Sequence, residues 1–210
     1  MQPNLYLLLL AAYLLTSYAC STTRQVATAA TGQFTAEQNT LITAGTASEP
    51  MRVWKINNYQ DSILLRTSSQ DVEVDPNDQT LQLFIDRLLT TVQDSMSLGV
   101  GIAAPQVGIL KKIIWVQRFD KEEQPWEVFI NPQIKQYSEL TRNGMEGCLS
   151  IPDRREECQR AYAILIEYDR PDGSHHIEMV EDFTAVIFQH EIDHLNGILY
   201  LDHLASELSE

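Results

Sequence analysis

Two histidines four residues apart, His190 and His194, are the side chains of this chain best suited to share a metal ion. In a helix, positions i and i+4 lie on one face, so both imidazoles could reach the same ion. Glu191 stands beside them and could exchange a proton with water near that ion. The same H-E-x-x-H pattern also occurs by chance in core helices. The pattern alone therefore leaves two interpretations open, a metal site or an ordinary helix of the core.

A catalytic site built on two histidines needs a third protein ligand. A zinc peptidase would place a glutamate about twenty residues past His194, which lies beyond Glu210. The alternative pattern with a third histidine fails at Tyr200. We therefore look upstream, where Cys148 follows Gly147 and could supply a thiolate, a strong ligand for a divalent metal. The competing interpretation makes this cysteine a small buried core residue.

A glycine-rich segment over residues 99–108 is a second candidate for ligand contact. Its glycines and Ala104 fit a dinucleotide-binding pattern, but that pattern must follow a strand and open a helix. Here the segment follows an amphipathic stretch and runs into Pro105. We expect a loop in which Gly101 lets the backbone approach a ligand and Gln106 presents its side-chain amide.

Two helices are predicted from the spacing of apolar residues. Apolar side chains recur every three or four residues over 79–97, which predicts an amphipathic helix. A second helix is expected over 183–196, with Val186 and Ile187 on the same face as His190. A metal site and an apolar wall would therefore share this helix.

The remaining elements are expected to be short strands. Alternating or continuous short apolar runs bounded by turn residues predict them, including a hairpin that turns at 169–173. Without regular alternation of strands and helices, the pattern indicates an α+β fold. In this fold, short and mostly antiparallel strands pack around the helix that carries H-E-x-x-H, preceded by one amphipathic helix. The expected strands or strand-like segments are 53–56, 63–65, 112–116, 127–130, 162–168, 176–180 and 198–204.

Composition excludes some classes of function. The formal net charge of −14 and the lack of long basic runs argue against a nucleic-acid partner. Three cysteines (Cys20, Cys148 and Cys158) are an odd and sparse set, which does not indicate a disulfide framework. We expect Cys158 to be a core residue.

The N-terminal part differs in texture from the rest. An apolar run over residues 5–15 is typical of a signal peptide, and the small residues before Cys20 resemble a bacterial lipoprotein processing site. The stretch that follows is rich in Ser, Thr, Ala and Gln and shows little periodicity. We therefore divide the chain into a signal-like or lipoprotein-like segment (1–20), a flexible linker (21–50) and a folded domain (51–210).

The N-terminal sequence is compatible with two localisations. If the N-terminal segment acts as a signal, the protein is exported or anchored to a membrane through Cys20. If translation starts near Met51, the protein is cytoplasmic.

Three segments together resemble one family, peptide deformylase. Residues 99–106, 146–150 and 189–197 match its three motifs without a gap and in the same order. The resemblance implies that Cys148, His190 and His194 hold one divalent ion. Ferrous iron is the usual ion of the family, with zinc, nickel or cobalt as possible substitutes.

The resemblance also implies an activity, the removal of formyl from N-formylmethionyl peptides or nascent chains. Glu191 would move the proton, while the Gln106 amide and the Leu149 backbone N–H would donate to the developing oxyanion. Glu146 and Arg160 would pair to brace the metal loop. The residues expected to contact substrate are Val100, Gly101, Val186 and Ile187.

The same residues are compatible with two other functions. One alternative is a metal-dependent amidase or peptidase with another acyl-peptide substrate, and another is an exported deformylase-like protein that binds without turnover. Many bacterial members carry a basic C-terminal helix thought to dock on the ribosome, and residues 198–210 contain no Lys or Arg. We expect a monomer.

Overall fold

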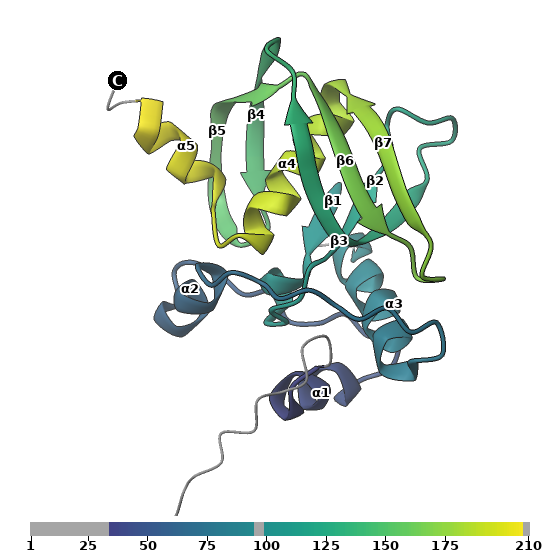
Figure 1. Cartoon of the computed structure of the whole chain (residues 1–210). Coiled ribbons are helices and arrows are strands. Elements are labelled where there is room, and N and C mark those ends of the chain that lie inside the picture. Colours follow the sequence, from purple (N-terminus) through teal and green to yellow (C-terminus); the bar gives the residue numbers. More distant parts are fainter. Residues whose placement is uncertain (1–33, 95–98, 208–210) are drawn as a thin grey trace, which may run out of the picture.

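The computed structural model describes residues 34–94 and 99–207 (Figure 1). The predicted signal-like segment, the start of the linker and the end of the predicted helix 79–97 lie outside these residues. In chain order the elements are α1 (Ala36–Thr43), α2 (Tyr59–Leu65), α3 (Gln79–Gln93), β1 (Gly101–Ala103), a 3-10 turn η1 (Ala104–Val107), β2 (Ile113–Gln117), β3 (Trp126–Tyr137), β4 (Thr141–Cys148), β5 (Ile151–Ala161), β6 (Ala163–Asp169), β7 (His175–Glu181), α4 (Asp182–Leu195) and α5 (Tyr200–Glu207).

A five-stranded antiparallel sheet forms the centre, in the order β1-β2-β3-β6-β7. A separate two-stranded sheet, β4-β5, stands beside it next to α5 (Figure 1). Mixed helices and antiparallel strands confirm the predicted α+β class. The hairpin of β6 and β7, with its turn after Asp169, is confirmed as well.

The two long helices cover opposite faces of the sheet. Ile113 and Trp115 of β2 belong to the core beneath α3, whereas Ile114 and Val116 belong to the core beneath α4. This arrangement explains why the sequence of β2 is continuously apolar, since a strand covered on both faces has no solvent side. Phe188 of α4 anchors the second core.

α3 begins where its sequence signals a start. The Asp78 carboxylate accepts hydrogen bonds from the backbone N–H groups of Thr80 and Leu81, which satisfies two donors of the first turn. The indole N–H of Trp115 donates to the Ile85 carbonyl at 2.9 Å and ties the helix to β2. The helix therefore reaches the glycine-rich segment in a fixed orientation.

The prediction of a flexible linker is wrong for residues 34–50, because this stretch folds onto α3. α1 starts with a capping box between Thr35 and Gln38, and its Ile42 is fully buried. The ring of Phe34 meets Phe84 of α3 edge to face at 5.8 Å.

Arg87 of α3 holds the same stretch by its backbone. Its buried guanidinium donates to the carbonyls of Leu41, Ile42 and Glu49 at 2.8–3.1 Å. These carbonyls include those at the end of α1, which the helix itself leaves unpaired. The anchor of the segment is thus a side chain more than thirty residues away, which local patterns do not reveal.

Three short segments predicted as strands are not strands in the structure. Residues 53–56 belong to no strand, although the Trp54 backbone N–H donates to the Gln106 carbonyl at 2.7 Å. Residues 63–65 belong to helix α2, because the Asn58 side chain caps its first turn. The segment 198–204 contributes most of α5 instead of a strand. Its apolar residues at 200, 201 and 204 fit a helical repeat as well as a short strand.

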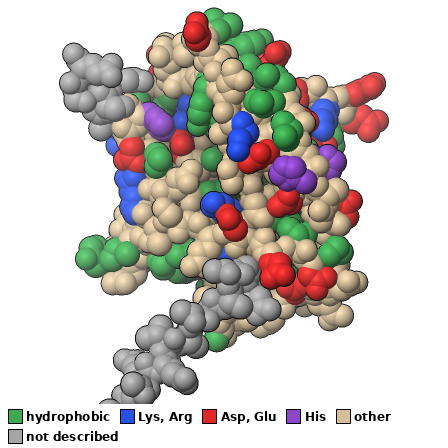
Figure 2. Space-filling model, viewed as in Figure 1, with side chains coloured by type: hydrophobic (Ala, Val, Ile, Leu, Met, Phe, Trp, Pro, Cys, Tyr) green, Lys and Arg blue, Asp and Glu red, His purple; other side chains and the backbone are tan. Residues whose placement is uncertain are grey.

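The β4-β5 hairpin was not predicted, although the strand after it was. β3 also extends beyond the predicted 127–130, because Asn131 adopts a φ of 52° and the register shifts while pairing with β6 continues. Figure 2 shows charged side chains of both signs among apolar ones on the face in view. An ion pair between Lys135 of β3 and Glu167 of β6 joins two neighbouring strands of the sheet at 2.8 Å. In the described part of the chain, no helix has the length and apolar character needed to cross a membrane.

Candidate active site

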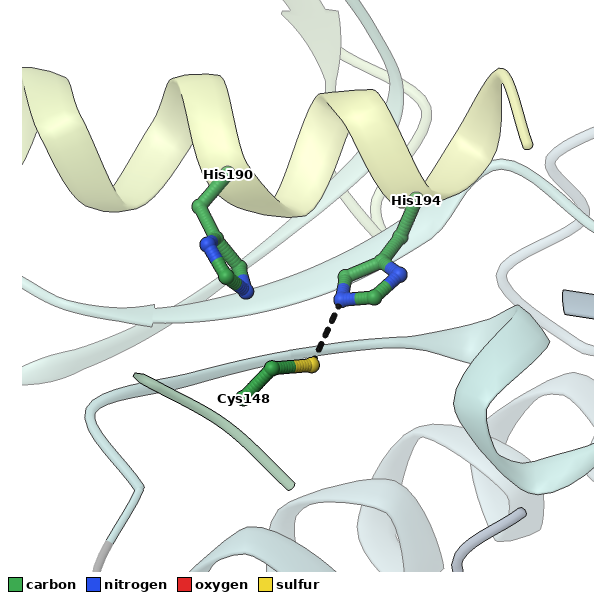
Figure 3. A group of neighbouring side chains, drawn as sticks. All are labelled: Cys148, His190 and His194. Atoms are coloured by element: carbon green, nitrogen blue, oxygen red, sulfur yellow. Dashed lines mark hydrogen bonds between the residues drawn. The ribbon is translucent and has the colours of Figure 1, made fainter. Parts of the chain in front are cut away.

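The helix α4 brings both histidines to one side, as predicted. His190 and His194 extend from successive turns toward Cys148 on the strand below (Figure 3). His194 is 1% exposed, and its Nε2 atom lies 3.1 Å from the Cys148 Sγ. Ligand atoms of all three residues lie within 4.8 Å of one another.

Cys148 is the last residue of β4, where the hairpin register shifts by a bulge. The bulge pairs Cys148 directly with Ile151 and leaves a tight turn between the two strands. The Ser150 backbone N–H points to the thiol sulfur at 3.4 Å. Burial would raise the pKa of the Cys148 thiol, but the His194 and His190 imidazoles outweigh it and lower the pKa well below its ordinary value. The thiolate form, which binds metals, is therefore favoured.

Glu146 fixes the orientation of His190. Its Oε2 atom lies 2.8 Å from the His190 Nδ1, which leaves the Nε2 atom of the same ring for a metal. Arg160 donates to both carboxylate oxygens of Glu146, at 2.7 and 3.0 Å. Burial would raise the pKa of Glu146, but the hydrogen bonds from His190 and Arg160 prevail and lower it to about 2. The predicted Glu146–Arg160 pair is confirmed.

Gln106 faces the same point from the 3-10 turn. Its Oε1 accepts the backbone N–H of Ala103 at 2.8 Å, so its amide nitrogen must face the other way. That nitrogen lies 3.5 Å from the Cys148 Sγ and 3.3 Å from the Ser150 hydroxyl oxygen. The side chain is buried and held at both ends, so its amide donor is fixed toward the site.

Glu191 lies beneath the glycine-rich segment. A Cβ atom at Gly101 would lie 2.6 Å from the Glu191 Oε1 and 2.8 Å from Ile187, so only glycine fits there. The carboxylate is 4% exposed. Burial raises its pKa to about 7, and the two nearby imidazoles offset this only in part. A carboxyl group with this pKa can both accept and donate a proton near neutral pH.

The cleft in front of these residues encloses about 1140 Å³. Its lining includes Val100, Gly101, Leu149, Val186 and Ile187, all predicted from the sequence to lie at the site. Val186 and Ile187 are buried on the His190 side of α4. An apolar side chain of a ligand could therefore lie beside the polar cluster.

The donor set fits a divalent ion. A thiolate and two imidazole nitrogens suit iron, zinc, nickel or cobalt. Among the described residues, the Glu191 Oε2 and the His194 Nδ1 are buried without a hydrogen-bond partner. Three close donors with a buried, unpartnered carboxylate oxygen beside them are what a catalytic metal site with a proton carrier requires.

Other predictions for single residues have mixed outcomes. Cys158 is buried, as expected for a core residue. Phe183, which its spacing in the helix also placed on the His190 side, is 40% exposed at the cleft edge, and its ring is tilted against that of Phe119 with centroids 5.2 Å apart. Two contacts of the site were missed by sequence reasoning. The Ser150 hydroxyl orients Gln106, and its place in the 146–150 motif was an available signal. The ring of Tyr200 lies against His190, and no local pattern indicated it.

Comparisons with known proteins agree with this geometry. The family model described as polypeptide deformylase matches residues 53–210. The peptide deformylase of Zymomonas mobilis is 40% identical over 147 residues, which is 67% of this chain and 80% of the relative. That of Desulforudis audaxviator is 38% identical over 154 residues, covering 72% and 94% of the two chains.

Solved structures give the same result. The Met-Ala-Ser-bound class I type b peptide deformylase of Acinetobacter baumannii matches with a TM-score of 0.66 and 34% identity, covering 74% of this chain and 99% of that one. The peptide deformylase of Thermotoga maritima matches with a TM-score of 0.65 and 32% identity, covering 74% and 97%. The chain therefore belongs to the polypeptide deformylase family.

Proposed function

We propose that this protein is a metal-dependent hydrolase that removes the formyl group from N-formylmethionyl peptides or nascent chains. The products are formate and a free N-terminal methionine. The observation that carries the proposal is the convergence of Cys148, His190 and His194 within 4.8 Å, beside the buried Glu191.

The proposed metal ligands are Cys148, His190 and His194, and the proposed ion is ferrous iron. Zinc, nickel and cobalt suit the same mixed sulfur and nitrogen donors. When bound, such an ion supplies Lewis-acid chemistry and makes water a nucleophile near neutral pH. Glu146 keeps the His190 ring oriented by accepting its Nδ1–H.

Glu191 is the proposed proton carrier. Its carboxylate takes a proton from the water that attacks the formyl carbon. The same group then donates that proton to the methionine nitrogen as the C–N bond breaks, so it ends the cycle as it began. The 4% exposure of Glu191 supports this role, because few solvent molecules compete for the proton.

Gln106 and Leu149 are the proposed oxyanion donors. As the formyl carbon becomes tetrahedral, its oxygen gains negative charge and needs fixed hydrogen-bond donors. The Gln106 amide supports this role because its orientation is set by Ala103 and Ser150. Leu149 follows Cys148 and would offer its backbone N–H. Losing one such donor typically costs about 3–4 kcal/mol of barrier.

The substrate methionine would occupy the apolar side of the cleft. Val100, Val186 and Ile187 offer apolar contacts, and Gly101 lets the backbone of the peptide approach. Burying a methionine side chain in such a pocket is worth about 1.5–3 kcal/mol. The pocket therefore favours methionine over a small or charged residue at this position.

The direct test uses the full chain, loaded anaerobically with ferrous iron and supplied with formyl-Met-Ala-Ser. Formate release is expected, whereas acetyl-Met-Ala-Ser should stay intact. Hydrolysis of the acetylated peptide would instead support an amidase with another acyl substrate. Binding of the formyl peptide to the loaded protein without formate release would support a non-catalytic binding protein.

A further inference from the structure

The C-terminal helix α5 reaches the candidate metal site through a chain of hydrogen bonds. His203 of α5 places its Nε2 atom 2.7 Å from the Asp193 Oδ2 on α4. The same carboxylate oxygen accepts the Arg160 Nη1–H at 2.6 Å. One oxygen of Asp193 therefore joins α5 to the arginine that braces the site.

The proton of the His203 ring can be assigned from these contacts. A nitrogen lone pair facing a carboxylate oxygen at 2.7 Å would be repulsive, so Nε2 must carry a hydrogen and donate to Asp193. The Arg160 Nη1 lies 3.1 Å from the same Nε2 atom, and the two nitrogens share one acceptor. His203 thus donates its Nε2–H to the Asp193 carboxylate and helps to hold it in place.

The chain continues from Arg160 to the metal ligand. Arg160 donates to both oxygens of Glu146, and Glu146 accepts the His190 Nδ1–H at 2.8 Å. The side chains of Arg160 and Glu146 are 5% and 6% exposed, while Asp193 is 18% and His203 is 35% exposed. The series therefore begins near the surface and ends at a buried ligand.

A second contact from α5 supports the same ring. Tyr200 stacks against His190 with ring centroids 6.0 Å apart and an interplanar angle of 24°. Tyr200 is fully buried, and its hydroxyl donates to the Arg154 carbonyl at 3.1 Å. The His190 ring is thus held in its plane by α5 and at its Nδ1 atom by Glu146.

We propose that His203 is a positioning residue for the metal ligand His190. By donating to Asp193, it fixes the carboxylate that directs Arg160 toward Glu146. Without that donor, Asp193 is free to turn toward solvent, and Arg160 can follow it away from Glu146. His190 would then lose the partner that keeps its Nε2 atom directed at the metal. The proposal rests on the metal site of the proposed function.

The test measures metal binding instead of turnover. The full chain is loaded with Co²⁺, and its visible absorption and its rate of metal transfer to a chelator are compared among variants. His203→Phe keeps an aromatic ring but removes the donor, so metal release should be about 10-fold faster and the absorption bands should shift. His203→Gln returns an amide donor near the Nε2 position and should restore both values.

Asp202→Asn is the matched control on the same helix. Asp202 pairs with the exposed Arg66 and accepts the Leu199 backbone N–H. The Asn side-chain oxygen can still accept that N–H, so this change removes an exposed ion pair and leaves Tyr200 and Asp193 in place. It should lower the melting temperature and leave the absorption and the release rate unchanged. Should His203→Phe not fold, Asp193→Asn tests the same link, because it removes the charged acceptor.

The outcomes separate the two proposals. If the unmodified chain does not bind Co²⁺, the metal site of the proposed function is wrong. If it binds Co²⁺ and His203→Phe releases the ion at the same rate with the same spectrum, only the role of His203 is wrong. Equal defects in His203→Phe and His203→Gln would also overturn that role, because returning a donor near the Nε2 position would then restore neither value.

Discussion

Two buried arginines, Arg160 and Arg118, are surrounded by acidic side chains, yet only one of them serves the candidate site. Arg160 is 5% exposed and pairs with Glu146 and Asp193. Arg118 is 1% exposed, at the end of β2. Burial and acidic ion-pair partners therefore do not distinguish the two arginines.

The cluster around Arg118 has its own partners. The guanidinium pairs with Asp120, Glu127 and Glu178 at 2.6–3.1 Å. It also lies over the rings of Phe129 and Phe188. The acids come from the β2-β3 connection, β3 and β7, so the ion pairs join these parts of the sheet, and the contact with Phe188 adds α4.

The difference lies in the next contact of each acid. Glu146 accepts a hydrogen bond from His190, a candidate metal ligand. Glu178 accepts one from Tyr168, and Glu127 pairs with Lys121. A buried ion pair therefore does not mark a functional site by itself, because such pairs also serve only structure. The two clusters differ in the residue that the paired acid contacts next, which is a candidate metal ligand only in the Arg160 cluster.

The largest expected effect lies inside the site and leaves both arginine clusters intact. Glu191→Gln removes the proton carrier and should lower kcat for formyl-Met-Ala-Ser by about 10²–10⁴-fold. The variant should still bind Co²⁺, measured by absorption. His194→Ala is the counterpart that should lose the metal. Equal loss of metal in both variants would contradict the division of roles between ligand and base.

Arg160→Met should affect both stability and the metal. It leaves Glu146, which is 6% exposed, with the His190 Nδ1–H as its remaining hydrogen-bond donor. Breaking a buried pair in this way costs about 3–5 kcal/mol of unfolding free energy, measured in urea. Metal affinity should fall by about 10–100-fold, because the orientation of His190 is released. Unchanged metal affinity would show that Arg160, like Arg118, contributes to stability alone.

Arg118→Met should affect stability alone. We expect a loss of about 3 kcal/mol, the lower end of the range, because its acids are 18–26% exposed and can be hydrated. Glu127 also keeps Lys121 and Arg170. The folded fraction should bind Co²⁺ and turn over substrate as the unmodified chain does. A spectral shift would show that this cluster also reaches the site.

The smallest expected effect is a pH dependence of the Arg118 contribution. Burial would raise the pKa of Asp120, but the hydrogen bonds and charge of Arg118 outweigh it and lower the pKa, and Arg118→Met removes these interactions. An acid whose pKa is lower in the folded state than in the unfolded chain stabilises the folded state in its ionised form. This contribution is fully present above the pKa of the unfolded chain and is lost as the pH falls through the pKa of the folded state. The stability gap between the unmodified chain and Arg118→Met should therefore narrow between about pH 5 and pH 3. Urea midpoints measured across this range check the prediction, and a widening gap would contradict it.

The sequence predicted the residues of the candidate site better than the strands and helices around it. His190, His194 and Cys148 were found because metal chemistry restricts residue types and spacing, and Gln106 because a glycine-rich turn presents its amide. The β4-β5 hairpin was missed because much of β5 is charged, as in residues 154–157, and lacks an apolar alternation. Its pairing follows from two strands meeting in space, which a local window does not contain.

The same limit applies to the contacts made by α5 and α1. The links from His203 through Asp193 to Arg160 join residues from three elements. α1 buries little apolar surface of its own apart from Ile42, so its sequence is similar to that of a linker. Both cases depend on partners that are distant in the chain.

Arg87 ties residues 41–49 to helix α3 through their backbone carbonyls. The segment shared with the family begins at residue 53, whereas Arg87 has its carbonyl acceptors before that point. The folded part of this chain therefore begins before the match to the family model does. Because the single side chain of Arg87 binds carbonyls at both ends of residues 41–49, the backbone amides of these residues should exchange with solvent together, in one opening event, instead of one residue after another.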